Sequence, residues 1–170
     1  MDLERLREVK RDATYFMGGG IDSNVYVIPP LPGGKDWVAK FYKSEVSERQ
    51  FRYYFDITNQ AARIAITERW TWQFNRPYGL LAVQIVPFAE VIIDNNQIIA
   101  VSKRIKAKRC DCVNDGNDFD EPFKLLGRFI ESRLGVRGIE LCSLNSRIDS
   151  KTKTMFITDL CSELRGLDNR

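Results

Sequence analysis

The sequence predicts an α+β fold built as a single domain. Three observations lead to this prediction: a length of 170 residues, a hydrophobic content of 44% beside 29% charged residues, and short β-type runs that alternate with two longer helical stretches. This length and balance are typical of a soluble globular domain with a sizeable core. The expected order is three strands, a long helix, two strands, a linker, a second helix and two final strands.

The N-terminal part is expected to be a short charged helix followed by an antiparallel meander. Residues 2–12 carry apolar side chains at every third position, which is typical of a helix with one buried face. Three β-type runs follow, interrupted by Gly18, Gly19 and Gly20 and by a turn at residues 31–36 that contains Pro and Gly. The runs are residues 13–17, 24–28 and 37–42.

A long helix is expected after the third strand. Ser47 and Gln50 have the spacing of a capping box, in which each side chain binds the backbone N–H of the other residue. An apolar stripe at helical spacing continues from there, and Pro77 is expected to end the helix. The stripe consists of Phe51, Phe55, Thr58, Ala62, Ile66 and Trp70.

Aromatic residues gather around the end of this stripe at Trp70, Trp72, Phe74 and Tyr78. One interpretation is a stacking platform for nucleic-acid bases. Packing in the core or at an interface is favoured, because large aromatic side chains are mostly buried. Any of these aromatics that are exposed would offer a surface to a protein partner or to a second copy of the chain.

The remaining chain predicts a hairpin, a linker, a helix and a second hairpin. Residues 90–94 and 97–101 flank Asn95 and Asn96, a strong hairpin turn signal. Residues 108–121 read as an acidic linker between a first part at 13–107 and a second part at 122–170. In the second part, a helix begins at Pro122 and ends at Gly135, with short strands to follow. The helix presents Phe123, Leu126, Ile130 and Leu134 on one face, and the strands are residues 147–148 and 155–158.

A basic run stands before the linker. Residues 103–109 hold five cations, which suits either a phosphate-contacting patch or a solvated segment. The second interpretation is favoured because acidic residues follow directly and balance the charge. The net charge of +3 does not by itself indicate nucleic acid or a membrane.

Composition excludes several mechanisms and suggests a compartment. The chain contains no His, so it has no Ser-His-Asp triad, Cys-His dyad or imidazole base. A charged N-terminus and the lack of a long apolar run predict a cytoplasmic protein with no membrane partner. The four Cys are then expected to be reduced thiols, since Cys110-x-Cys112 with two distant Cys is not a standard zinc spacing.

Two N-terminal motifs suit phosphate binding. Gly18, Gly19 and Gly20 lie between two expected strands, where backbone N–H groups can approach phosphate oxygens because no Cβ intervenes. Lys40 lies among apolar residues in the third strand. Its ammonium needs a carboxylate, a phosphate or water as partner, because an unpaired buried charge is costly.

Two C-terminal motifs suit magnesium binding. Asn145 lies in the loop after the second helix, in the pattern Glu140, four residues, Asn145. Asp159 follows the last expected strand. An Asn and an Asp at the mouth of one hairpin offer the oxygen ligands that Mg²⁺ prefers.

In this order, the four motifs resemble those of the protein-kinase-like superfamily. Residues 18–26 resemble the Gly-rich loop with Ser23 in the third Gly position, and Val38-Ala39-Lys40 resembles the strand-three lysine motif. Glu140 to Asn145 resembles the catalytic loop, and Asp159-Leu160-Cys161 resembles the Asp-Phe-Gly metal motif. The resemblance implies a five-stranded antiparallel small lobe with one long helix, a hinge at residues 103–107, and a minimal helix-and-hairpin remnant of the second lobe.

The resemblance also implies site residues and cofactors. Gly18, Gly19, Gly20 and Ser23 would cover the phosphates of ATP in a cleft between the two lobes, and Lys40 would contact the α- and β-phosphates. Asn145 and Asp159 would hold Mg²⁺, and Glu140 would stand in the catalytic position. The carboxylate partner of Lys40 on the long helix is expected to be Glu68, with Asp56 as the alternative.

The chain departs from the family pattern at three positions. Gly138 stands where the catalytic loop has His, Glu140 where it has Asp, and Cys161 where the metal motif has Gly. Nine residues follow Cys161, too few for an activation segment or a substrate platform. The expected function is therefore a reduced kinase-like protein that binds ATP and Mg²⁺ with weak or no phosphotransfer. The alternatives are a pseudokinase-like interaction module and an unrelated α+β nucleic-acid-binding protein.

Overall fold

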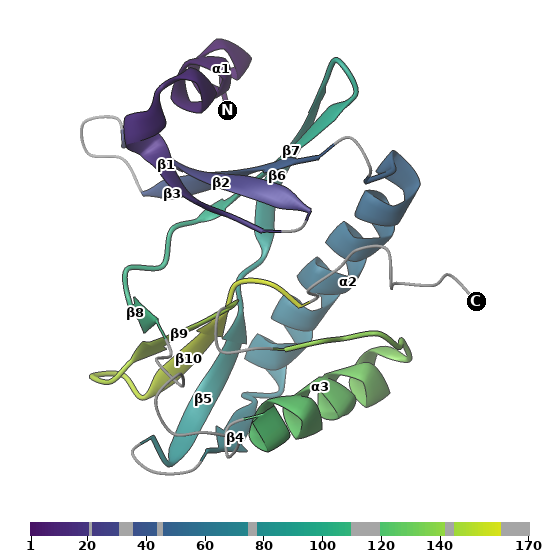
Figure 1. Ribbon diagram of the computed structural model, residues 1–170. Helices are drawn as coiled ribbons and strands as arrows, with labels where there is room; N and C mark the ends of the chain where they lie inside the picture. Colours follow the sequence, from purple (N-terminus) through teal and green to yellow (C-terminus); the bar gives the residue numbers. More distant parts are fainter. Residues whose placement is uncertain are drawn as a thin grey trace. The chain divides into compact units, whose positions relative to one another are not determined.

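The computed structural model describes residues 1–20, 22–30, 36–43, 46–74, 78–109, 120–141 and 145–160 (Figure 1). The chain divides into two compact units. Unit 1 comprises Met1–Arg52 and Pro87–Arg104, and unit 2 comprises Tyr53–Val86 and Ile105–Arg170. The fold class is α+β, as predicted, with a five-stranded antiparallel sheet in unit 1 and a second sheet in unit 2.

Unit 1 is built around the antiparallel sheet β1-β2-β3-β7-β6. Its strands are β1 (Phe16–Gly19), β2 (Ser23–Ile28), β3 (Trp37–Tyr42), β6 (Phe88–Asp94) and β7 (Gln97–Lys103). The β6–β7 hairpin turns at Asn95 and Asn96, whose φ angles of 47° and 65° are those that a tight hairpin turn requires. The prediction of this hairpin is confirmed.

A short helix, α1 (Leu3–Arg11), packs on this sheet. Leu6 and Val9 are fully buried against Ile28 and Phe41, so the three-residue apolar spacing did mark the inner face. On the outer face, Arg7 forms a two-pronged ion pair with Asp94, with distances of 2.9 and 2.6 Å. The segment predicted as a strand at residues 13–17 is instead a 3-10 turn, η1 (Ala13–Tyr15), followed by β1, because the Asp12 side chain caps the turn by accepting from the Thr14 N–H.

The long helix α2 (Glu48–Thr67) begins in unit 1 and continues into unit 2. The capping box is confirmed: the Gln50 N–H donates to Ser47 Oγ at 3.2 Å, and the Ser47 N–H donates to Gln50 Oε1 at 3.3 Å. The helix ends ten residues before Pro77, because Arg69 adopts a left-handed φ of 53° and the chain turns into a strand.

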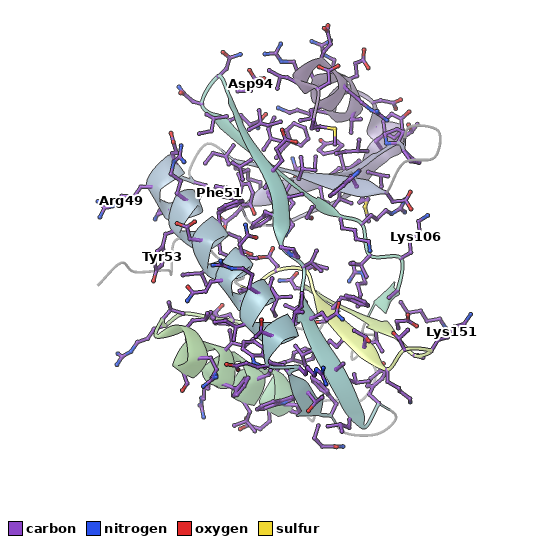
Figure 2. The ribbon with its side chains drawn as sticks, turned by 180° about the vertical axis from the view of Figure 1, so that it is seen from behind. Arg49, Phe51, Tyr53, Asp94, Lys106 and Lys151 are labelled. Atoms are coloured by element: carbon purple, nitrogen blue, oxygen red, sulfur yellow. The ribbon has the colours of Figure 1, made fainter. Side chains whose placement is uncertain are left out.

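The predicted apolar stripe of α2 is partly wrong. Ile66 is 65% exposed, whereas Tyr54 is buried. Figure 2 shows Arg49 and Tyr53 projecting outward from the helix, and Phe51 on the opposite side. The residues buried along α2 are Phe51, Tyr54, Ile57, Thr58, Ala61, Ala62 and Ala65. The inner face thus passes through Tyr54 rather than Phe55.

Unit 2 contains the sheet β4-β5-β10-β9-β8 and the helix α3 (Asp120–Leu134). Its strands are β4 (Thr71–Gln73), β5 (Leu80–Ile85), β8 (Lys108–Arg109), β9 (Ser146–Asp149) and β10 (Thr154–Ile157). β9 and β10 form the predicted antiparallel hairpin, and β10 also pairs with β5 in parallel. Three strands were not predicted: β4, β5 and β8, the last of which lies within the run read as a linker.

The aromatic residues that follow α2 pack on α3 within unit 2. Trp70 is 5% exposed and its ring lies 5.0 Å from that of Phe129, measured between centroids. Phe74 is buried against Phe123, and the Trp72 indole N–H donates to the Pro122 carbonyl at 3.1 Å. The favoured interpretation, packing in the core, is therefore confirmed for Trp70 and Phe74, whereas Trp72 and Tyr78 are half-buried.

The described residues include no helix that is both long enough and apolar enough to span a membrane.

Candidate functional site

The glycine-rich turn of unit 1 joins β1 to β2. The Gly20 N–H donates to the Ser23 carbonyl at 2.8 Å and closes the turn. A Cβ at Gly19 would lie 2.7 Å from Asn24 Oδ1, so the Asn24 amide would have to move to make room for a side chain there. Ile21 lies outside the described residues.

Lys43 contacts this turn from the end of β3, a feature that sequence reasoning missed. Its Nζ donates to the Gly20 carbonyl at 2.8 Å, and its backbone N–H donates to the Asp22 carbonyl at 2.8 Å. A lysine directly after an apolar strand is a weak signal, since most such lysines are simply solvated. In the folded chain, Lys43 places a positive charge at the glycine-rich turn of unit 1.

Lys40 occupies the middle of β3, with Val25 and Ala100 as its neighbours on the adjoining strands. The residue is only 7% exposed, and its Nζ lies 6.0 Å from the centre of the Phe88 ring. Among the described residues, Lys40 is the only Lys or Arg that is buried. The positive charge of Lys40 is attracted to the electron-rich face of that ring.

In unit 2, the β9–β10 hairpin brings Asn145 and Asp159 together. Ser146 pairs with Ile157, so the two residues stand just beyond the last paired rung. The Asn145 carbonyl accepts from both the Thr158 N–H at 2.8 Å and the Thr158 hydroxyl at 2.9 Å. These two bonds fix Asn145 beside the residue that precedes Asp159. The juxtaposition follows the prediction that both residues stand at the mouth of one hairpin.

Tyr54 of α2 reaches the same place, and sequence reasoning missed it. Its hydroxyl donates to Asp159 Oδ1 and accepts from the Leu160 N–H at 3.2 Å. The side chain is 1% exposed. The only signal in the sequence was helical spacing. Tyr54 lies three residues after Phe51 and four before Thr58, so all three share the buried face of α2.

The backbone of Glu140 contacts Leu160, the residue that follows Asp159. Its N–H donates to the Leu160 carbonyl at 3.1 Å, while the residue itself is exposed. The preceding segment is fixed by Glu131 of α3, whose Oε1 accepts from the Gly138 and Ile139 N–H groups at 2.6 and 3.0 Å. Gly138 has a φ of 87°, a conformation that side chains rarely adopt, which accounts for glycine at this position.

Glu68 and Asp56, the carboxylates suggested as partners of Lys40, are both exposed. Glu68 follows α2 and accepts from the Trp70 indole N–H at 2.8 Å and from the Arg133 guanidinium. These hydrogen bonds, that of Trp70 foremost, lower the pKa of the Glu68 carboxyl below its ordinary value. Asp56 is exposed, so neither acid lies on the buried face of α2 where a partner of Lys40 was expected.

The oxygen donors of unit 2 fit Mg²⁺ bound together with phosphate. Within the described ranges, no group of three or more His, Cys, Asp or Glu could hold a metal by itself. Mg²⁺ is usually held by one or two carboxylates together with phosphate oxygens and water, so one carboxylate and one amide are a suitable set. Cys110, Cys112, Cys142 and Cys161 lie outside the described residues.

Comparison with known proteins identifies the fold. No known protein family and no curated protein matches the sequence. Among solved structures, 720 chains match, including the crystal structure of Rad53 1-466 in complex with AMP-PNP. That match has a TM-score of 0.53 and a sequence identity of 16%, and it covers 86% of this chain and 37% of the Rad53 chain.

The likeness to the kinase Rad53 is one of fold. At this identity, it shows that the chain has a kinase-like fold, while function has to be argued from the residues. This chain spans little more than a third of the length of the Rad53 chain. The likeness does not favour the alternative of an unrelated α+β protein.

Proposed function

We propose that this chain is a reduced kinase-like protein that binds ATP together with Mg²⁺ and transfers phosphate weakly or not at all. The kinase-like fold supports this proposal, and so does the ligand of the Rad53 structure, because AMP-PNP is an ATP analogue. ATP, Mg²⁺ and any activity are assigned here from the residues of this chain.

The observation that carries the proposal is the buried Lys40. Lys40 is 7% exposed in the middle of β3, and its positive charge there would attract the negatively charged phosphates of ATP. We assign the glycine-rich turn, with Gly18, Gly19, Gly20 and Ser23, to the phosphates of the nucleotide, and the ammonium of Lys43 at this turn would add a further donor.

Asn145 and Asp159 are assigned to the metal. From one hairpin mouth, the Asn145 side-chain amide and the Asp159 carboxylate would supply two oxygen ligands to a cation. Bound Mg²⁺ would neutralise charge on the phosphate oxygens. Asp159 would hold the cation by charge, and the Thr158 bonds would keep Asn145 in register with it.

Weak or absent transfer follows from Glu140. Its carboxylate is one methylene farther from the backbone than that of the Asp it replaces, which would displace it from a hydroxyl that aspartate could reach. Gly138 supplies no imidazole to orient it. These substitutions favour the pseudokinase-like form of the proposal, in which the nucleotide is bound and seldom consumed.

Thermal unfolding with and without ATP and Mg²⁺ tests the binding proposal. At an ATP concentration of about 100 times Kd, the wild type should gain about 2.7 kcal/mol of stability. Lys40→Met keeps the aliphatic stem and removes the charge, so it should abolish the shift. Lys151→Met, which removes an exposed lysine in the β9–β10 turn, is the matched control and should keep it. A wild type that ATP does not stabilise, or an equal shift in Lys40→Met, contradicts the proposal.

A further inference from the structure

Tyr54 makes two contacts at the residues proposed to hold the metal. Its hydroxyl donates to Asp159 Oδ1 and at the same time accepts from the Leu160 N–H at 3.2 Å. All three residues belong to unit 2. One buried hydroxyl from α2 is therefore bonded both to the carboxylate and to the backbone of the next residue.

These contacts are specific rather than a general result of burial on this face. Thr58 lies one turn farther along α2 and is 2% exposed, yet its hydroxyl has no hydrogen-bond partner among the described residues. Tyr54 thus differs from its neighbour in having a carboxylate within reach. A hydrogen bond to an ionised oxygen is also about twice as strong as one between neutral groups.

The physical effect of such a bond is to fix the carboxylate. An aspartate side chain has two rotatable bonds and in water samples several orientations. Anchoring Oδ1 to a phenol that is itself held by the Leu160 N–H leaves the second oxygen with a defined direction. Removal of a group that orients a metal ligand in this way typically lowers metal affinity about 10- to 100-fold.

We propose that Tyr54 is a positioning residue that orients the Asp159 carboxylate for a divalent cation. This inference rests on the proposed function, which assigns the metal to Asp159. It adds a determinant of metal affinity on α2, a helix on which the sequence suggested only acidic candidates. Tyr54 acts through Asp159 and is not assigned any contact with the cation.

The test compares Tyr54→Phe with Tyr53→Phe. Tyr53 is the adjacent tyrosine and projects outward from α2, so its variant is a matched control (Figure 2). Binding of Mn²⁺, as a probe for Mg²⁺, is measured by the electron paramagnetic resonance signal of the free ion, with ATP present. Tyr54→Phe should weaken Mn²⁺ binding about 10- to 100-fold, and Tyr53→Phe should not change it.

A second readout separates positioning from simple loss of structure. ATP binding in the absence of metal should be the same in Tyr54→Phe and the wild type. In an Asp159→Asn background, Tyr54→Phe should have no further effect on Mn²⁺ affinity, because the residue acts through that carboxylate. Equal Mn²⁺ affinity of the wild type and Tyr54→Phe overturns the inference alone. Failure of the wild type to bind Mn²⁺ overturns the inference and the proposed function together.

If Tyr54→Phe does not fold, hydrogen exchange in the wild type decides. The Leu160 amide is held by the Tyr54 hydroxyl, so positioning predicts that its protection persists or increases when ATP and Mg²⁺ are added. Loss of that protection on adding ATP and Mg²⁺ would mean that Tyr54 releases this loop when the metal binds, which contradicts a positioning role.

Discussion

In the proposed function, Glu140 is the residue that would decide between nucleotide binding and turnover. Its backbone is fixed beside Leu160, and its side chain is exposed. A general base contributes roughly 100- to 10,000-fold to a rate, but only when it lies within hydrogen-bond reach of the proton it removes. The extra methylene of Glu140 moves its carboxylate away from the place that an aspartate carboxylate would occupy.

Transfer of radiolabelled γ-phosphate from ATP to the protein itself checks the role of Glu140. We expect the wild type to transfer no more phosphate than Asp159→Asn. The transfer rate of Glu140→Gln should differ from that of the wild type by less than about tenfold, because loss of a working base would lower the rate far more. Robust transfer that disappears in Glu140→Gln would show that Glu140 is a competent base and that the chain is an active enzyme.

At this scale, the sequence predicted positions better than contacts. Lys40 was expected in the third strand and Asp159 after the last one, because short β-type runs bounded by turn residues indicate strands. The Tyr54 contact could not be predicted. It joins residues 105 positions apart, and helical spacing alone did not distinguish Tyr54 from Phe55 as the inward residue.

Among the elements, α2 and α3 are connected through Glu68 and the aromatic cluster. Glu68, just beyond α2, pairs with Arg133 near the end of α3, and Trp70 packs against Phe129 of the same helix. The Trp70 indole N–H and the Arg133 guanidinium lower the pKa of the Glu68 carboxyl. The sequence suggested Glu68 as the partner of Lys40, with Asp56 as the alternative. The position of an acid near the end of a helix does not indicate the residue with which it pairs, so the pair with Arg133 could not be predicted.

The Glu68 pair predicts a pH dependence of stability. Because the folded-state pKa lies below the ordinary value of 4.5, the carboxylate stabilises the fold above pH 4.5, and this contribution disappears as the pH falls through the folded-state pKa. The effect should be small, since exposed ion pairs are well screened by solvent and salt.

Urea unfolding at several pH values measures this effect. The wild type should be more stable than Glu68→Gln near neutral pH, and the difference should shrink below pH 4.5. Arg133→Met removes one of the two partners, so it should reduce the pH dependence without abolishing it. A difference between the wild type and Glu68→Gln that is the same at every pH would contradict this account.

Other elements show why some predictions were wrong. β4 was missed because the helix was expected to continue to Pro77, whereas it ends at Thr67. β5 pairs in parallel with β10, and the partners lie about 70 residues apart in the sequence, so no local pattern indicates the pairing. The β6–β7 hairpin was predicted because Asn95 and Asn96 are its own local turn signal.

For the whole molecule, the kinase-like fold and the proposed ligand are supported by different observations. The fold follows from the sheet of unit 1 and from the likeness to Rad53. The ligand proposal follows from the buried Lys40 in unit 1 and from the Asn145 and Asp159 pair in unit 2. If one ATP with Mg²⁺ is the ligand of both sets, then removing either set, or the metal, must weaken the same binding event.

Calorimetric titration of the full chain with ATP tests this central claim most directly. The account predicts one ATP bound per wild-type chain in the presence of Mg²⁺. It also predicts clearly weaker binding when Mg²⁺ is chelated, when Asp159 is changed to Asn or when Lys40 is changed to Met, with Lys151→Met unchanged. The absence of binding by the wild type, or binding that neither chelation nor the Lys40 and Asp159 variants weaken, would contradict it.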